Sequence, residues 1–359
     1  MQQPKVLVTF DSMKYPNSGF FYFGKSLGNC LLDENKRFDL TYYLHRRAIY
    51  QFADRVKIQY LSKLHKVFYP SSGKYDLVHF TDQYCRLRPQ RVKGKKILTV
   101  HDINFMHENL SPRKVKKKTE RLTRHIETCD KVVAISNFVA QDILKHFPSA
   151  QGKMQVIYNG ADKLSVAEDH QPTYQPANPF IFTIGHVAPK KNFAVLPALL
   201  HGNNYELVIA GIETIYKDEI MAEARKWNCE DRVKIIGTIN DDDKAWYYKN
   251  CLAFAFPSIA EGFGLPVIEA MHFGKPVFLS THTSLPEVGG DAAFYFDSFD
   301  GEAMQRVFAA GMEKYNSTEN IRATIMAHAE TFNWHNTARQ YLALYSECLN
   351  FSFSLSAAL

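Results

Sequence analysis

Short apolar runs without a helical period recur along this chain of 359 residues, and stretches with a helical pattern separate them. The runs carry β-branched and aromatic side chains and are followed by polar or glycine-containing turns. They span residues 5–10, 76–80, 96–102, 131–136, 155–162, 180–185, 205–211, 232–237 and 252–258. Strands that alternate with helices form parallel sheets, so the sequence predicts an α/β fold. One of the helices is expected in the apolar stretch after Asn192.

The length favours two domains rather than one. A stretch rich in proline and polar residues, AEDHQPTYQPANP at 167–179, is typical of a linker. We therefore predict an N-terminal domain over 1–170 and a C-terminal domain over 177–334. An amphipathic helix is expected over 332–349, and the remaining segment, 335–359, is assigned to this C-terminal helix.

Composition indicates the compartment. No apolar run is long enough to span a bilayer, and the N-terminus lacks the flanks of a signal peptide. The six cysteines lie far apart and form no CxxC pair, as expected of reduced thiols, and no zinc cluster is visible. We predict a cytoplasmic protein.

The charge is unevenly distributed. Residues 1–175 hold 29 Lys and Arg against 16 Asp and Glu, a balance of +13, whereas residues 176–359 hold 14 against 21, a balance of −7. No nucleic-acid-binding motif accompanies the basic half. An anionic lipid or a lipid-linked sugar is a better partner, and a basic helix that begins at Ser111 and Pro112 is one place for such a contact. The alternative is a basic face that only aids solubility.

The stretch 253–290 predicts a strand, a glycine-rich turn and a helix that begins near Leu265. Gly262 and Gly264 lie in the turn, and Pro266 lies in the first helical turn, where no N–H donor is needed. Backbone N–H groups at such a helix start favour an anion. Glu261 and Glu269 bracket the turn, and carboxylates are good acceptors for sugar hydroxyls.

These residues resemble the C-terminal half of glycosyltransferase family 4. The resemblance rests on two Glu separated by seven residues in EGFGLPVIE, followed by EAM, by GKPV at 274–277 and by SLPEVGGDAA at 284–293. It implies the GT-B architecture, in which two Rossmann-like domains face each other across a cleft. It also implies that the last helix packs back on the first domain, that the acceptor binds in the first domain, and that the donor binds in the second.

The resemblance assigns roles to single residues. Glu261 would approach the donor sugar, Glu269 would bind the ribose, and the turn from Gly262 through Phe263 and Gly264 to Leu265 would contact sugar and pyrophosphate. Basic residues would clamp the pyrophosphate after Gly185, where His186 replaces a frequent Arg. The further residues assigned to donor or acceptor contacts are Gly19, His101, Lys190, Lys191, Thr238 and Ile239.

We interpret the chain as a retaining hexosyltransferase of the mannosyl or glucosyl type, acting in polysaccharide or lipopolysaccharide biosynthesis. The donor would be a GDP- or UDP-linked sugar, and the acceptor a glycan or lipid-linked hydroxyl. Glu261, His101 and Lys191 are the predicted catalytic residues. We expect neither a metal nor a further cofactor, because Lys190, Lys191 and the turn supply positive charge at the phosphates.

Three alternatives remain open from the sequence. One is a related cleft enzyme, such as a phosphorylase or a nucleotide-sugar epimerase, which would act without a glycan acceptor. Residues 19–26, GFFYFGKS, match the phosphate-loop pattern of nucleotide hydrolases, although four aromatic residues fill its variable positions. A non-catalytic protein that binds nucleotide sugars would share every donor residue.

Asp241, Asp242 and Asp243 are similar to a metal-binding DxD, but acidic residues also favour a helix start.

Overall fold

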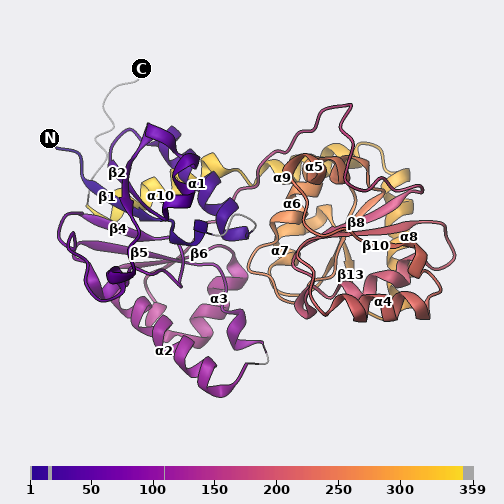
Figure 1. Cartoon of the computed structure of the whole chain (residues 1–359), viewed down its shortest axis with the longest axis horizontal. Helices are drawn as coiled ribbons and strands as arrows, with labels where there is room; N and C mark the ends of the chain where they lie inside the picture. The colour runs from indigo at the N-terminus through magenta and orange to yellow at the C-terminus, as the bar shows by residue number, and fades with distance from the viewer. Residues whose placement is uncertain (1, 15–17, 109, 351–359) are drawn as a thin grey trace. The chain divides into compact units, whose positions relative to one another are not determined.

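The computed structural model describes residues 2–14, 18–108 and 110–350. The chain forms two compact units, residues 1–160 with 333–359, and residues 161–332 (Figure 1). The part of the expected C-terminal segment beyond residue 350 lies outside the described residues. In the part of the chain that the structure describes, no helix combines the length and the apolar character needed to cross a bilayer.

The first unit is built on a seven-stranded parallel sheet in the order β3-β2-β1-β4-β5-β6-β7. Val6 in the interior strand β1 pairs with Leu40 on one side and with Leu77 on the other. The strands β1 and β4 are buried along nearly their whole length, as expected of a sheet covered on both faces. The strands are β1 (Lys5–Thr9), β2 (Asp39–Leu44), β3 (Lys57–Tyr60), β4 (Leu77–Phe80), β5 (Lys95–Val100), β6 (Lys131–Ala134) and β7 (Met154–Val156).

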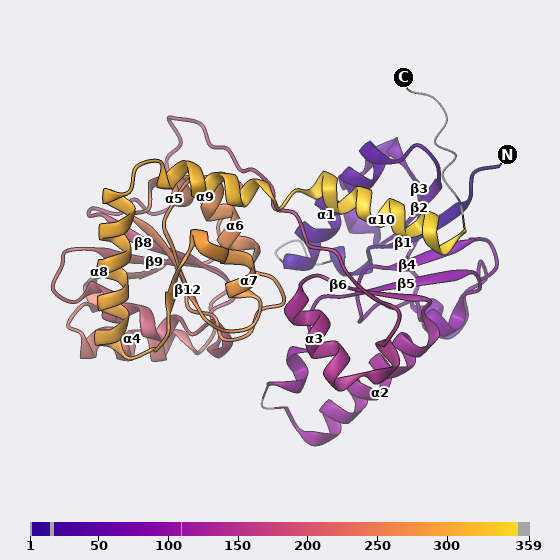
Figure 2. The same ribbon diagram turned by 180° about the vertical axis from the view of Figure 1, so that it is seen from behind.

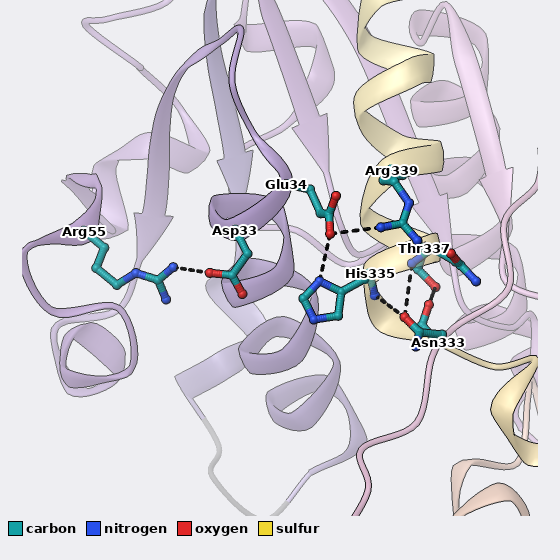
Figure 3. Close-up of polar contacts among 8 residues, drawn as sticks. Asp33, Glu34, Arg55, Asn333, His335, Thr337 and Arg339 are labelled. Atoms are coloured by element: carbon teal, nitrogen blue, oxygen red, sulfur yellow. Dashed lines mark hydrogen bonds and ion pairs between the residues drawn. The ribbon is translucent and has the colours of Figure 1, made fainter. Parts of the chain in front are cut away.

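The helices of this unit include the last one of the chain. They are α1 (Gly19–Glu34), α2 (Pro112–Thr128), α3 (Asn137–His146) and α10 (Trp334–Cys348). Figure 2 shows α10 running beside α1. The Glu34 carboxylate of α1 accepts hydrogen bonds from His335 and Arg339 of α10, both at 3.0 Å (Figure 3). The Asn333 side chain caps α10 by accepting from the His335 amide at 2.8 Å.

The side chains of α10 also reach the sheet of the first unit. The Tyr345 hydroxyl lies 2.7 Å from Nδ1 of His79 in β4, and the Tyr341 hydroxyl lies 3.0 Å from Oγ1 of Thr99 in β5. All four side chains are buried. Helix α10 therefore belongs to the core of the first unit.

Residues 19–26 form the first two turns of α1 and not a phosphate loop. Ser18 caps the helix by accepting from the Phe21 amide, and Phe21 and Phe23 are buried in the core. A phosphate loop needs non-helical backbone that wraps an anion with small residues. The nucleotide-hydrolase alternative is therefore wrong.

The second unit is built on a six-stranded parallel sheet in the order β10-β9-β8-β11-β12-β13. The sheet and its helices follow the alternation expected from the sequence. The strands are β8 (Phe180–Ile184), β9 (Glu206–Ala210), β10 (Val233–Ile235), β11 (Ala253–Phe256), β12 (Val277–Ser280) and β13 (Phe294–Phe296). The helices are α4 (Lys217–Lys226), α5 (Asp241–Asn250), α6 (Leu265–His272), α7 (Leu285–Gly289), α8 (Gly301–Ser317) and α9 (Ile321–Glu330).

One expected helix of the second unit takes another form. The apolar stretch after Asn192 is a 3₁₀ helix, Phe193–Leu200, rather than an α-helix. Pro197 lies inside it, and proline lacks the N–H and clashes with the carbonyl four residues earlier. The tighter 3₁₀ form is used in such short connecting pieces.

The division between the units falls at Gly160 rather than at residue 170. The segment 161–179 packs on the second unit through buried carboxylates. Asp243 accepts from His170 at 2.7 Å, and Glu206 accepts from the amide of Ala177 at 2.8 Å. The polar, proline-rich stretch is therefore packed against the second unit and is not a free linker.

Candidate active site

The turn between β11 and α6 has the expected local structure. Gly264 is the N-cap of α6 with φ of 115°, a left-handed conformation that favours glycine. A Cβ atom there would lie 2.9 Å from Cδ2 of Leu285, the end of a flexible side chain that can shift. Leu265 and Pro266 open the helix, and Phe263 is buried beneath the turn. The helix start therefore points its dipole toward the turn.

Glu261 lies before this turn and belongs to a small polar network. Its Oε1 atom accepts a hydrogen bond from the Lys191 ammonium group, and Ser258 Oγ lies 2.6 Å from the same oxygen. The side chains of Lys191 and Glu261 are 13% and 14% exposed, so the ion pair is largely shielded from water. The structure thus brings together two of the three predicted catalytic residues, which stand 70 positions apart.

The turn after β8 supplies the basic side of this network. Lys191 ends a short 3₁₀ helix, Pro189–Lys191, and its ammonium group lies 4.7 Å from the centre of the Phe256 ring. The Lys190 carbonyl accepts from the Ile259 amide at 2.9 Å, which ties this turn to the segment after β11. His186 is exposed on the same connection.

Two glycines bring neighbouring strand ends close together. Gly185 follows β8 and Gly211 follows β9. A Cβ atom on Gly211 would lie 1.8 Å from the Gly185 carbonyl oxygen, and Gly211 has φ of 137°. Only glycine fits at Gly211, and the close approach fixes the path of the chain toward Lys190 and Lys191.

Glu269 lies in α6 and is held by two side chains of α5. Lys244 Nζ donates to Oε1 at 3.0 Å, and the Tyr248 hydroxyl donates to Oε2 at 2.9 Å. The carboxylate is 13% exposed and the Lys244 side chain 11% exposed. The pair therefore fixes the direction of Glu269 before any ligand binds.

Thr238 and Ile239 lie in the connection from β10 to α5, and the acidic triplet follows them. Asn240 caps α5 by accepting from the Asp243 amide at 2.7 Å. Burial raises the pKa of Asp243, but hydrogen bonds from Thr173 and His170 outweigh it and hold the pKa below its usual value. Because Asp243 is committed to these partners, the triplet acts as a helix start.

His101 follows β5 in the first unit and is buried between two aromatic rings. The rings of Phe20 and Phe23 lie 4.8 and 4.5 Å away, edge-on. Its Nε2 atom lies 2.8 Å from the Thr81 carbonyl oxygen, which can only accept, so Nε2 carries the proton and Nδ1 keeps a lone pair. Burial lowers the pKa of His101 to about 4, so the ring is neutral at pH 7. A neutral imidazole of this tautomer can accept a proton at Nδ1.

Gly19 is the first residue of α1, and a Cβ atom there would meet nothing within 4 Å. It is exposed, so the backbone at this helix start is open to a ligand. The donor and acceptor candidates of the first unit, Gly19 and His101, are thus positioned by α1 and β5.

Sequence reasoning missed a buried acid, Asp82, whose chain neighbours Thr81 and Gln83 contact His101. Asp82 follows β4, is 6% exposed, and accepts from the Tyr84 amide at 2.6 Å. Burial, together with the charge of Asp11, raises the pKa of Asp82 to about 7. Its neighbour Gln83 accepts from the His101 amide at 3.1 Å. The sequence signal for Asp82 was the polar run Thr81-Asp82-Gln83 directly after a buried strand. Ligands of parallel sheets bind at the carboxyl ends of such strands.

One group of potential metal ligands occurs among residues 2–14, 18–108 and 110–350. The ligand atoms of Cys30, Asp33 and His335 lie within 4.8 Å of one another. Asp33 is paired with Arg55 at 2.5 Å, and His335 with Glu34 (Figure 3). These contacts join α1 to its neighbours and explain the cluster without an ion.

Comparison with known proteins shows the family of the chain. Residues 33–163 match the model of "Glycosyltransferase Family 4", and residues 167–325 match that of "Glycosyl transferases group 1". The chain is 26% identical to O-antigen chain mannosyltransferase B of Escherichia coli over 276 residues, 72% of this chain and 71% of that protein. It is 31% identical to the serotype-specific mannosyltransferase WbdA of Escherichia coli over 259 residues, 64% of this chain but only 30% of that protein.

A solved structure extends the likeness to the fold. Alr3699/HepE from Anabaena, in complex with UDP-glucose, superposes with a TM-score of 0.71 at 18% identity, over 96% of this chain and 100% of that chain. Two parallel Rossmann-like units are the architecture of the GT-B fold, which this solved structure shares. The chain belongs to the family 4 type of GT-B enzymes and is a glycosyltransferase.

Proposed function

We propose that the protein transfers a hexosyl group from a nucleotide diphosphate sugar to a hydroxyl of a glycan or lipid-linked acceptor, with retention of the anomeric configuration. The observation that carries the proposal is the shielded network of Lys191, Glu261 and Ser258 beside the start of α6. It brings a cation for phosphate and a carboxylate for sugar hydroxyls into direct contact, although the two residues stand 70 positions apart in the chain.

The donor would bind across the strand ends of the second unit. Glu269, held by Lys244 and Tyr248, would accept hydrogen bonds from ribose hydroxyls. Thr238 and Ile239 would contact the base. Gly185, His186 and the turn from Gly262 to Leu265 would border the pyrophosphate. A donor phosphate would compete with Glu261 for the Lys191 ammonium group, leaving the carboxylate to orient the sugar.

Departure of the nucleotide diphosphate places negative charge on its phosphate oxygens. Lys190, Lys191 and the N-terminus of α6 would stabilise that charge, and one such donor is typically worth about 3–4 kcal/mol. Because these groups supply positive charge themselves, we expect transfer without a metal ion or a further cofactor.

The acceptor would bind at the first unit. The Nδ1 atom of His101 would accept a hydrogen bond from a hydroxyl of the sugar or the acceptor. We assign His101 as a positioning group and not as the base, because a donor phosphate oxygen could take the acceptor proton during retaining transfer.

The names of the relatives favour mannose over glucose and bacterial envelope glycans over other products. Two of them are mannosyltransferases, and one is named for the O-antigen chain. We propose a cytoplasmic reaction in polysaccharide or lipopolysaccharide synthesis, with peripheral contact between the basic first half and an anionic membrane.

A panel of GDP- and UDP-linked sugars tests the donor. A ligand at 100 times its dissociation constant stabilises the folded protein by about 2.7 kcal/mol, which a thermal shift detects. The donor that stabilises most should then be consumed with a glycan acceptor, and NMR should show that the product keeps the donor's anomeric configuration.

Each outcome of this test is informative. Binding without turnover across acceptors would favour the non-catalytic alternative. An inverted product would refute retention, and a panel without any stabilising sugar would refute the donor assignment. Glu269→Gln is a suitable control, because it should weaken the shift without changing the product.

A further inference from the structure

Four large apolar side chains are exposed within a stretch of nine residues, 60–68, of the first unit. Tyr60, Leu64, Val67 and Phe68 are 46%, 75%, 68% and 68% exposed, around a 3₁₀ helix, Lys63–Lys66. The amides of Val67 and Phe68 both donate to the Leu64 carbonyl at 2.9 Å. This single turn places Leu64, Val67 and Phe68 on one side. We name these four residues the apolar turn.

The exposure of the apolar turn is built into the fold. His65, in the middle of the turn, is buried, and its Nδ1 atom lies 2.9 Å from the Tyr43 hydroxyl. Tyr69 is also buried, with its ring 5.0 Å from that of His65. The polar ring therefore points inward and the apolar side chains outward, the reverse of an ordinary surface turn. Clustered exposed apolar side chains mark interaction sites.

The charge around the apolar turn identifies the kind of partner. Residues 55–75 contain five Lys and Arg and no Asp or Glu, and two of the five, Arg55 and Lys57, pair with Asp33 and Asp39 of neighbouring segments. Lys63 and Lys66 are exposed on the turn itself, and the Arg46 guanidinium lies 5.1 Å from the centre of the Tyr60 ring. A second copy of the chain would bring like charges together. An anionic lipid surface accepts apolar side chains and attracts lysines at the same depth.

The position of the apolar turn fits a lipid-linked acceptor. It follows Tyr60, the last residue of β3, which is parallel to its neighbours. The chain therefore leaves β3 on the side of the sheet formed by the carboxyl ends of the strands. The strands β4 and β5 also end on this side, where Asp82 and His101 follow them. A membrane contact on this side would bring the acceptor residues of the first unit toward the bilayer surface.

We propose that the apolar turn inserts into the interfacial layer of an anionic membrane, with Lys63 and Lys66 at the lipid phosphates. The proposal rests on the proposed peripheral membrane contact and names its surface. The basic helix α2 would add long-range attraction only. Its Lys118 already lies over the rings of Tyr84 and Phe105, 5.6 and 5.4 Å from their centres.

Sedimentation with vesicles tests the proposal. The full chain should bind vesicles of phosphatidylglycerol and phosphatidylcholine but not vesicles of phosphatidylcholine alone. The triple variant Leu64→Ser, Val67→Ser and Phe68→Ser should bind the anionic vesicles about tenfold more weakly or worse, because each side chain loses its burial in lipid. Ile215→Ser, at an 89% exposed apolar residue of the second unit, is the matched control and should bind normally.

Three outcomes would overturn the proposal. The first is unchanged binding by the triple variant while Lys114→Glu, Lys116→Glu and Lys117→Glu abolish it, which would place the contact on α2. The second is self-association of the wild-type chain that the triple variant removes. The third is a wild-type chain that ignores anionic vesicles at low salt. Sugar transfer to a soluble acceptor is measured separately with the wild-type chain. If the wild-type chain binds anionic vesicles but shows no transfer, the transferase proposal alone is refuted.

A labelling experiment avoids the risk that the triple variant misfolds. All six native cysteines are buried, so a single Leu64→Cys residue can be labelled selectively with an environment-sensitive dye. Its emission should shift to the blue with anionic vesicles and be quenched by a lipid-bound quencher. Emission that stays unchanged while the chain sediments with the vesicles would refute insertion of this turn.

Discussion

Removal of the Ser258 hydroxyl tests most directly how the Glu261 side chain is positioned in the donor site. Ser258 is fully buried, with Oγ 2.6 Å from Oε1 of Glu261 and 3.0 Å from the Lys190 carbonyl oxygen. One hydroxyl proton serves one acceptor at a time, and the nearer, charged oxygen is favoured. We expect Ser258→Ala to release Glu261 toward Lys191 and to leave it misaligned for the donor sugar.

The size of the effect follows from the loss of one hydrogen bond to a charged group, about 1.5–3 kcal/mol. If about 2 kcal/mol of it is realised in the transition state, kcat/KM falls roughly 30-fold. The stability of the fold should fall less, by about 1 kcal/mol, because Lys191 still pairs with the carboxylate.

Steady-state transfer and urea unfolding measure the two quantities on the same protein. The control is Thr183→Val in β8, which removes a buried hydroxyl that has no hydrogen-bond partner among the described residues. It should keep full activity. The positioning role would be refuted if kcat/KM of Ser258→Ala stays within threefold of the wild-type value. It would also be refuted if the loss of kcat/KM, expressed as a free energy, is no larger than the loss in unfolding free energy.

Three further predictions concern the same sites. Glu261→Ala should lower kcat by orders of magnitude, whereas Glu269→Ala should mainly raise the donor KM; equal effects on both parameters in both variants would contradict the division of roles. Activity should survive EDTA, and loss that manganese restores would return attention to Asp241. His101 has a pKa of about 4 when folded against about 6.5 when unfolded, so the unfolded chain binds more protons and stability falls as pH drops from 6.5 toward 4. At pH 5 His101→Gln should reduce the slope of unfolding free energy against pH by about 1 kcal/mol per unit, and an unchanged slope would show that this ring titrates normally.

Periodicity and turn chemistry predicted most elements of the fold. The apolar runs became strands because each is short and buried in a parallel sheet, and the helix starts at Ser18, Ser111 and Gly264 lie where capping residues and glycine stand in the sequence. The α-helix expected after Asn192 was wrong because one proline, Pro197, outweighed the apolar pattern. Local rules therefore worked where no single residue opposed them.

The site was only partly predictable, since its geometry comes from contacts between distant segments. The sequence indicated Glu269 as a ligand residue, but not that Lys244 and Tyr248 of another helix would hold it. Likewise, nothing local showed that Ser258 would join Glu261 to the turn of Lys190. Such second-layer residues carry no motif of their own, because any polar side chain in the right place can serve.

The return of α10 to the first unit has a consequence for how the protein is made. During synthesis, residues 1–160 emerge first, yet Tyr341 and Tyr345 are needed to bury Thr99 and His79 of their sheet. The first unit can therefore be completed only after the second unit has been synthesised, because α10 follows the second unit in the chain. A chain truncated before Trp334 would expose apolar surface on a sheet that has lost its cover, and we expect it to depend on chaperones or to aggregate.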